Sequence, residues 1–297
     1  MIYKKTKGDY ILDTFNYALL TALFLITFYP FWYVFVVSLN DPTDTIKGGL
    51  TLFPRILTFS SYGVIWRDKE FMSSINVTLA RTLIGTPVTL LCTSMLAYVF
   101  TKKDLIGYSY FKKAFVFTMY FGGGLIPFYM VLKSINLIDN FLVYIIPSAI
   151  GVYYMILISA FMNELPKELE ESATLDGANE LYIFFKIIIP LSKPILATIA
   201  LFVAINHWNS FFDAYLFTSK QSLKPLQVVI MNILNNYQTS SMMNSSSAIV
   251  NITQKNSITP DSIRMAATIV STVPIILAYP FVQKYFVKGM MIGAVKA

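Results

Sequence analysis

The feature that most constrains this chain is a set of six long apolar runs, each close to the length that crosses a lipid bilayer. The hydrocarbon layer is about 30 Å thick, so a helix needs roughly 20 mainly apolar residues to span it. The runs cover residues 15–39, 75–100, 114–132, 141–163, 194–212 and 265–283. A membrane β-barrel would show short segments of alternating hydrophobicity instead. The sequence therefore predicts an all-α, polytopic membrane protein with six transmembrane helices.

The composition points the same way. Hydrophobic residues make up 56% of the chain and charged residues 13%, with a mean hydropathy of +0.60. Ordinary soluble domains have about 45–50% apolar and about 25% charged residues. We therefore expect residues 1–297 to form a single transmembrane domain in which lipid replaces water as the solvent.

The distribution of lysine predicts the orientation, because positively charged residues close to span ends are retained in the cytoplasm. The short connection between the second and third runs carries Lys102, Lys103, Lys112 and Lys113. If this connection is cytoplasmic, both termini and the segment 164–193 are cytoplasmic as well. The net charge of +7 is then a signature of topology and does not indicate binding to nucleic acid.

Two connections on the opposite side are long. Residues 40–74 mix glycine and proline with aromatic residues, and we expect them to form a folded cap. Residues 218–263 form a long extracytoplasmic loop, which includes the serine-rich stretch 239–247. The first part of this loop, residues 225–237, predicts a helix on the outer surface because its apolar residues have helical spacing. These residues are Leu226, Val229, Ile230 and Ile233.

Glycine and proline interrupt several of the apolar runs. The sites are residues 122–124, Pro30, Gly85, Pro87, Pro127, Pro147, Pro274 and Pro280. Proline removes a backbone donor, so each break must be satisfied by neighbouring helices, side chains or water. Bent helices around a polar path would produce this pattern, although glycine and proline are also generally more frequent in membrane helices.

The charged segment 164–193 separates two apolar runs and predicts a helical hairpin. Pro166 suits the first position of a short helix, and the acidic residues that follow it favour the dipole of that helix. Gly177 provides the backbone freedom for a sharp turn at the end of the helix. A second helix then leads to Pro190, which stops it at the membrane. Its predicted apolar face consists of Leu181, Phe184, Phe185 and Ile188.

A longer pattern within this hairpin resembles a known family. The pattern begins with Glu171, Ser172 and Ala173. Three residues separate it from Gly177, nine more separate Gly177 from Ile187, and one separates Ile187 from the pair Ile189 and Pro190. This spacing is similar to the EAA motif of importer permeases of the ATP-binding cassette (ABC) class, with Ser172 in place of alanine and Ile189 in place of leucine. Further segments resemble the carbohydrate branch typified by the second maltose permease subunit, and within it the LplC-type subgroup for complex sugars. They are residues 119–127, 166–173, 207–210 and 288–296.

The resemblance implies a fold, a set of partners and a mechanism. It implies the type I ABC importer permease fold in a bacterial cell membrane, assembled with a second homologous permease, two ATPase subunits and an extracytoplasmic solute-binding protein. The hairpin would be a coupling helix that docks on an ATPase subunit. The implied docking residues are Glu171, Ser172, Ala173, Asp176 and Gly177. The chain lacks a G-x-x-x-x-G-K-[ST] loop, so we expect no enzyme activity and no cofactor here, and ATP and Mg on the partner subunits.

Span five carries the candidates for a substrate path, which are Asn206, Trp208, Asn209 and Asp213. Sugars bind through hydrogen bonds and aromatic stacking, and Asn206, Asn209 and Asp213 would share one helical face at i, i+3 and i+7. The alternative is that these side chains form hydrogen bonds between helices or subunits. His207 is the only histidine, which makes a histidine-based metal site unexpected.

The sequence therefore predicts a permease subunit of an ATP-driven importer for oligosaccharides or sugars derived from complex polysaccharides. One alternative is a secondary transporter with Arg81 and Asp213 as its ion-coupling residues, since ionisable groups within spans often have functions. Arg81 lies near the outer end of its span, so snorkelling to the interface is its simpler role. An ABC permease for a non-sugar solute and a membrane anchor for a cytoplasmic enzyme are the remaining alternatives.

Overall fold

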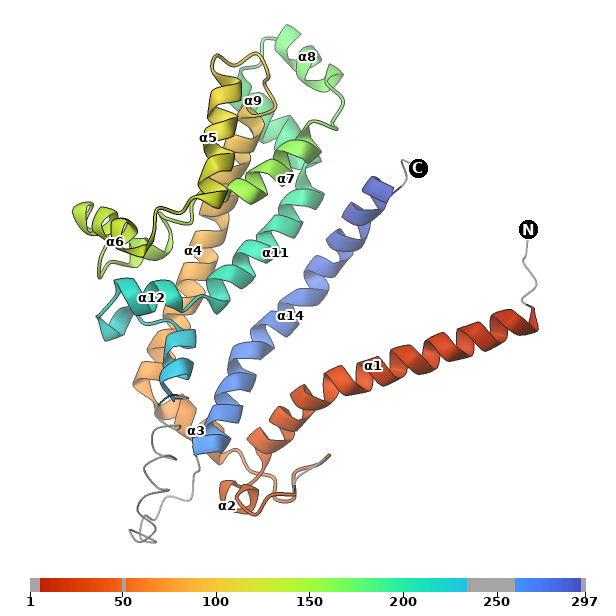
Figure 1. Ribbon diagram of the computed structural model, residues 1–297, viewed down its shortest axis with the longest axis vertical. Coiled ribbons are helices and arrows are strands. Elements are labelled where there is room, and N and C mark those ends of the chain that lie inside the picture. The colour runs from red at the N-terminus through yellow and green to blue at the C-terminus, as the bar shows by residue number, and fades with distance from the viewer. Residues whose placement is uncertain (1–5, 50–51, 234, 236–259, 295–297) are drawn as a thin grey trace. The chain divides into compact units, whose positions relative to one another are not determined.

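A computed structural model of the chain describes residues 6–49, 52–233, 235 and 260–294, and the side chains as far as residue 280 (Figure 1). Within these ranges every regular element is a helix, apart from one isolated bridge between Asn40 and Leu57. The all-α prediction is therefore confirmed. The chain forms two compact units, residues 1–68 with 230–272 and residues 69–229 with 273–297.

The first unit contains the long helix α1 and a folded loop. α1 covers Lys7–Leu39, and a capping box between Thr6 and Asp9 starts it. Two short helices follow, α2 at Pro42–Thr45 and α3 at Ser60–Arg67. The helix α14, Pro260–Ala294, begins in this unit and continues into the second.

Asn40 organises the loop after α1. Its side-chain oxygen accepts hydrogen bonds from the backbone N–H groups of Arg55 and Ile56, at 2.8 and 3.1 Å. Its amide donates to the carboxylate of Asp44, which also pairs with the guanidinium of Arg55 at 2.8 Å. These contacts hold the described part of the loop in one conformation, in agreement with the predicted folded cap.

The second unit is built around α4, α7 and α11 (Figure 1). Its elements are α4 (Lys69–Val99), α5 (Tyr108–Tyr120), α6 (Leu125–Ser134), η1 (Phe141–Tyr144), α7 (Val152–Met162), α8 (Glu168–Leu175), α9 (Glu180–Ile183), η2 (Phe184–Ile188), α10 (Ile189–Leu191), α11 (Lys193–Asn209), α12 (Phe212–Phe217) and η3 (Gln221–Leu223). An apolar core joins the end of α4 to α7, α11 and the hairpin through Ala97, Ile158, Phe184 and Ile199.

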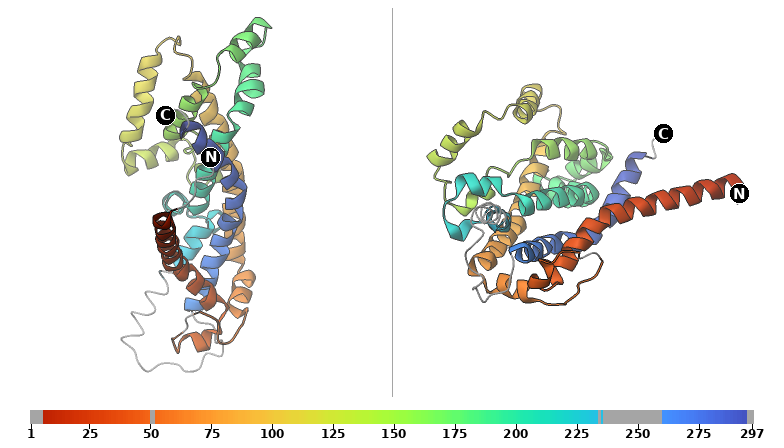
Figure 2. Two further views of the ribbon diagram at one scale, coloured as in Figure 1. Left: turned by 90° about the vertical axis from the view of Figure 1, so that its right-hand side faces the viewer. Right: turned by 60° about the horizontal axis from the view of Figure 1, so that its bottom comes forward.

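In the part of the chain that the structure describes, three helices are long and apolar enough to cross a membrane: α1, α4 and residues 261–280 of α14. Two further spans are possible if two helices that follow each other with a sharp bend between them count together as one crossing. α5 and α6 meet at 115°, and residues 180–191 meet α11 at 82°. The sharp change of direction between α5 and α6 can be followed in Figure 2. The remaining predicted run, residues 141–163, contains η1 and the 11-residue helix α7. The count of six spans stays a prediction.

The bend between α5 and α6 has a local cause. Gly123 and Gly124 have φ angles of +68° and +95°, in the region that favours glycine because other residues meet steric hindrance there. The predicted interruption at residues 122–124 therefore breaks the helix. Pro30 and Pro87, in contrast, lie within continuous helices, α1 and α4.

The hairpin has the predicted helix, turn and helix, with two differences. The first helix, α8, begins at Glu168, and Pro166 lies before it. The face predicted for the second helix is wrong for Leu181 and Phe185, which are 60% and 47% exposed. The π-helical turn η2, whose wider spacing differs from the 3.6-residue period of an α-helix, accounts for Phe185, whereas Leu181 lies before this turn in α9. The buried residues are Ile183, Phe184 and Ile188.

Pro190 is part of the last short helix, α10, and the chain changes direction after it at Ser192. The helix therefore ends one residue later than predicted. A helix is also present at residues 226–233, where Leu226 and Val229 are buried as their spacing predicts. The serine-rich stretch 239–247 lies outside the described residues.

Candidate functional site

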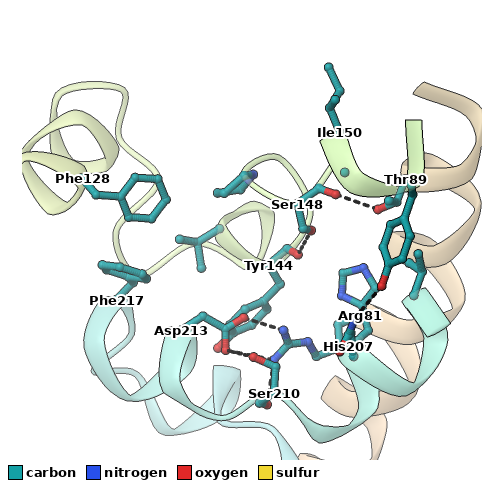
Figure 3. A pocket seen from close by; sticks show the side chains of 16 residues that line it. Arg81, Thr89, Phe128, Tyr144, Ser148, Ile150, His207, Ser210, Asp213 and Phe217 are labelled. Carbon is teal, nitrogen blue, oxygen red and sulfur yellow. Dashed lines mark hydrogen bonds and ion pairs between the residues drawn. The ribbon is translucent and has the colours of Figure 1, made fainter. Parts of the chain in front are cut away.

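The second unit contains a cavity of about 370 Å³ between α4, the segment from η1 to α7, and the region where α11 gives way to α12 (Figure 3). Apolar and aromatic side chains form much of its wall, among them Phe128, Val203 and Phe217. Its polar lining consists of Arg81, Thr89, Tyr144, Ser148, Tyr154, Asn206, His207, Ser210 and Asp213. A mainly apolar wall with a few polar groups is typical of small-molecule sites, which are about 300–1,000 Å³ in volume.

An ion pair between Arg81 and Asp213 forms one side of this cavity. The guanidinium contacts both carboxylate oxygens, with Nη2 to Oδ2 at 2.5 Å and Nη1 to Oδ1 at 3.3 Å. The guanidinium also lies 4.4 Å from the ring centre of Tyr144. Only 2% of the Arg81 side chain is exposed, so it does not snorkel to an interface. A charge in a membrane span is costly unless it is paired, and here Asp213 neutralises it.

The cavity lies where the helix of span five is broken. α11 ends at Asn209, Ser210 is extended, and α12 starts at Phe212. Arg81 donates to the carbonyl oxygen of Ser210 at 3.2 Å, and Asp213 accepts from the Ser210 hydroxyl at 2.9 Å. A broken helix leaves backbone groups without intrahelical partners, and this pair of charges satisfies part of that need.

The break also corrects the predicted path face. Asp213 belongs to α12 and so does not continue the face of Asn206 and Asn209 on α11. The cavity lining includes Asn206 and Asp213 but not Trp208 or Asn209. Trp208 is buried, and Asn209 accepts a hydrogen bond from Gln227 at 3.3 Å. The structure thus brings two of the four predicted path residues to the cavity.

Other lining residues were not predicted from the sequence. Tyr154 accepts a hydrogen bond from the amide of Asn206 at 2.9 Å, and Tyr144 donates to the carbonyl oxygen of Leu223 at 2.7 Å. His207 packs against Gly85, where any added Cβ would lie 2.5 Å from its Nε2. The sequence feature that could have indicated this contact was Gly85, because a glycine within an apolar run allows another helix to approach closely. No cluster of metal-ligating side chains occurs among the described residues.

The hairpin presents a second candidate site. Glu171, Ser172, Asp176 and Gly177 are exposed, whereas Ala173 is half-buried and packs toward the core. A Schellman motif ends α8, with hydrogen bonds from Gly177 N–H to the carbonyl oxygen of Thr174 and from Ala178 N–H to that of Ala173. Gly177 has a φ of +84°, in agreement with the prediction that this glycine provides the backbone freedom for a sharp turn.

Leu175 is a hairpin residue that was not predicted from the sequence. It lies at the end of α8 and is 89% exposed. Single exposed apolar side chains are common on protein surfaces, but this one lies directly beside the exposed groups of the predicted docking contact. The signal in the sequence was a leucine placed directly before Asp176 and Gly177, at the end of a helix whose other apolar residues are Leu169 and Ala173.

An all-helical membrane protein with a polar cavity at a broken helix and an exposed hairpin at the end of its helices has the architecture of a transporter subunit. Residues 2–292 match the family described as "Binding-protein-dependent transport system inner membrane component", and the chain belongs to this family. It is therefore a membrane permease subunit of the ABC importer class and not an enzyme. The family implies partner ATPase subunits and a solute-binding protein.

Relatives match the chain over nearly its whole length. Protein LplC of Bacillus subtilis (strain 168) is 36% identical over 292 residues, which cover 98% of this chain and 97% of LplC. The polygalacturonan/rhamnogalacturonan transport system permease protein YtcP of the same organism is 35% identical over 289 residues, 96% of this chain and 98% of YtcP. A solved structure has a TM-score of 0.85 and 31% identity, covering 96% of this chain and 99% of that one. It is a chain of a bacterial ABC transporter involved in the import of the acidic polysaccharide alginate.

Proposed function

We propose that this chain is the transmembrane permease subunit of an ATP-driven importer for oligosaccharides released from complex polysaccharides. The observation that carries the proposal is the cavity at the break between α11 and α12, in a chain that matches sugar permeases from end to end. Its hydroxyl, amide and imidazole groups suit sugar hydroxyls, and the aromatic side chains suit the apolar faces of sugar rings. Named candidates for these contacts are Tyr144, Tyr154, Asn206 and His207.

The hairpin between residues 164 and 193 is the proposed coupling element. Glu171, Ser172, Asp176 and Gly177 would contact an ATPase subunit, and the half-buried Ala173 would support them from the inner side of α8. Leu175 would fill an apolar pocket of that subunit. ATP and Mg are then bound by the ATPases, and their closure moves the hairpin.

The complete transporter would contain this chain, a second homologous permease, two ATPase subunits and an extracytoplasmic solute-binding protein. Both termini and the hairpin would face the cytoplasm, because lysines gather in the segments on that side. An ion-coupled secondary transporter is not supported. Its proposed coupling residues, Arg81 and Asp213, neutralise each other in the structure, and the relatives named above are ABC permeases.

Reconstitution tests this proposal. The chain, its permease partner, the ATPases and the binding protein would be placed in proteoliposomes with a labelled oligogalacturonide, an alginate oligosaccharide or a neutral maltooligosaccharide. We expect accumulation of at least one of these sugars only when both ATP and the binding protein are present, with ATP hydrolysis stimulated by the loaded binding protein. Accumulation driven by an ion gradient in liposomes without the ATPases would contradict the proposal.

A further inference from the structure

Lys102 lies just beyond the end of α4 and contacts both helices of the hairpin. Its ammonium nitrogen is 2.5 Å from Oε2 of Glu170 on α8 and 3.5 Å from Oε2 of Glu180 on α9. The two carboxylates come from opposite sides of the turn at Gly177. One cation therefore joins three helical elements that the sequence separates.

Tyr98, on the last turn of α4, strengthens this junction. Its hydroxyl donates a hydrogen bond to Oε2 of Glu180 at 2.6 Å, and its ring lies 4.8 Å from the ammonium of Lys102. The ring also packs against Phe184 of the hairpin, with 5.4 Å between ring centres. Only 7% of Tyr98 is exposed, so its hydroxyl has a fixed position.

Lys102 keeps its positive charge over the physiological pH range. Partial burial alone would lower the pKa of Lys102, but hydrogen bonds with Glu170 and Tyr98 and the charge of Glu170 outweigh it and raise the pKa above the ordinary value of lysine. About a third of the lysine side chain is exposed, so each ion pair contributes little on its own. The role of the network therefore lies in its geometry, because it holds α8 and α9 to the same point.

α4 connects this junction to the cavity. It carries Tyr98 at one end and Arg81 on the cavity wall, about 26 Å away along a continuous helix at about 1.5 Å per residue. The turn after α4 is fixed as well, since the Thr101 hydroxyl donates to the carbonyl oxygen of Tyr98 at 2.7 Å. Displacement of the hairpin would thus reach the cavity wall through a rigid element.

We propose that Lys102, supported by Tyr98, Glu170 and Glu180, is a positioning residue that transmits movement of the hairpin to α4 and so to the cavity. This inference rests on the proposed function of the hairpin as the ATPase contact. Without the ammonium group, α9 would keep its hydrogen bond from Tyr98 to Glu180, but α8 would lose its ion pair through Glu170 and be joined to α4 mainly by apolar packing. Apolar contacts have little directionality, so α8 could move without α4.

The test compares Lys102→Met with Lys102→Arg and with the control Lys103→Met in the complete reconstituted transporter. Lys103 is an exposed neighbour, and its replacement removes the same charge. We expect Lys102→Met to lower the number of sugars taken up per ATP hydrolysed roughly threefold to tenfold, a typical size for residues that carry coupling. Lys102→Arg should keep most of the ratio because it preserves the charge and the contact with the Tyr98 ring.

The double variant Glu170→Gln/Glu180→Gln provides a second arm that leaves the lysine in place. It should lower the uptake ratio by a similar factor, and adding Lys102→Met to it should cause little further loss because the three groups act together. The inference would be overturned if Lys102→Met and the double variant took up as many sugars per ATP hydrolysed as Lys103→Met does. Reduced recovery of the complex with an unchanged ratio, which is the result expected of a merely structural role, would overturn it as well. Uptake by the wild-type complex tests the proposed function separately.

Discussion

At the scale of residues, the buried pair of Arg81 and Asp213 determines the local structure around the cavity. The two residues are 132 positions apart in the sequence, so the apolar pattern could mark them as unusual but could not predict that they pair. A buried ion pair adds little net stability, whereas removal of one partner typically costs about 3–5 kcal/mol. The pair therefore fixes how α12 meets α4.

Gly85 provides a test of the contact between α4 and α11. An alanine Cβ at this position would lie 2.5 Å from Nε2 of His207, and overpacking of this kind costs about 1–3 kcal/mol. We expect Gly85→Ala to lower the melting temperature of the purified transporter. Gly63→Ala is the matched control, since no atom lies within 4 Å of its added Cβ and it is in the helix α3. Equal melting temperatures for the two variants would show that the helices are farther apart than described.

Asp139 predicts a dependence of stability on pH. Its carboxylate accepts hydrogen bonds from the side chain and backbone of Ser219 and from Lys220 N–H, which lower its pKa from 3.8 to about 2. The folded protein therefore binds the proton less tightly than the unfolded chain, and the stabilisation is complete above about pH 4. It is lost as the pH falls toward 2. We therefore expect the melting temperature of the wild type to exceed that of Asp139→Asn above about pH 4, and this difference to shrink as the pH falls toward 2. A difference in melting temperature that does not change with pH would contradict this role of Asp139.

At the scale of elements, the sequence predicted most of the hairpin and the position of its turn. The acidic first turn of α8 and Gly177 were sufficient for this, because local capping does not depend on distant residues. The buried face of the second helix was not predictable from periodicity. Its π-helical turn shifts Phe185 outward, and such turns have no clear signature in a single sequence.

The interruptions of the apolar runs were also predicted only in part. Three consecutive glycines separate α5 from α6, since two of them adopt positive φ angles. The proline positions gave a mixed result, because Pro87 lies inside the continuous helix α4 while the run containing Pro147 is divided into η1 and α7. A single missing N–H can be compensated within a helix, so proline alone does not determine a break. The break between α11 and α12 contains no glycine or proline, and there Arg81 donates a hydrogen bond to the carbonyl oxygen of Ser210.

At the scale of the whole molecule, α1 shows that the chain is suited to lipid. This helix is long and apolar enough to cross a membrane, and most of its apolar side chains are exposed within the first unit. In the proposed transporter, lipid and the second permease would bury these side chains. The sequence was sufficient to predict the class of transporter, because the EAA spacing and the six apolar runs are local patterns. The cavity combines four distant segments of the chain. Of its lining, Asn206 and Asp213 were predicted as path residues, and Arg81 was named only as a coupling residue of the alternative secondary transporter.

The central claim is that the hairpin transmits closure of the ATPases to the transport path. Uptake of sugar and hydrolysis of ATP, measured in the same proteoliposomes, test it most directly. Glu171→Ala removes an exposed carboxylate of α8, Gly177→Ala strains the turn at φ +84°, and Glu164→Ala is a control at an exposed glutamate before α8. We predict that the first two variants reduce uptake by at least about tenfold while the ATPases still bind nucleotide, as expected for loss of a docking hot spot. Unchanged uptake in both variants would contradict the claim.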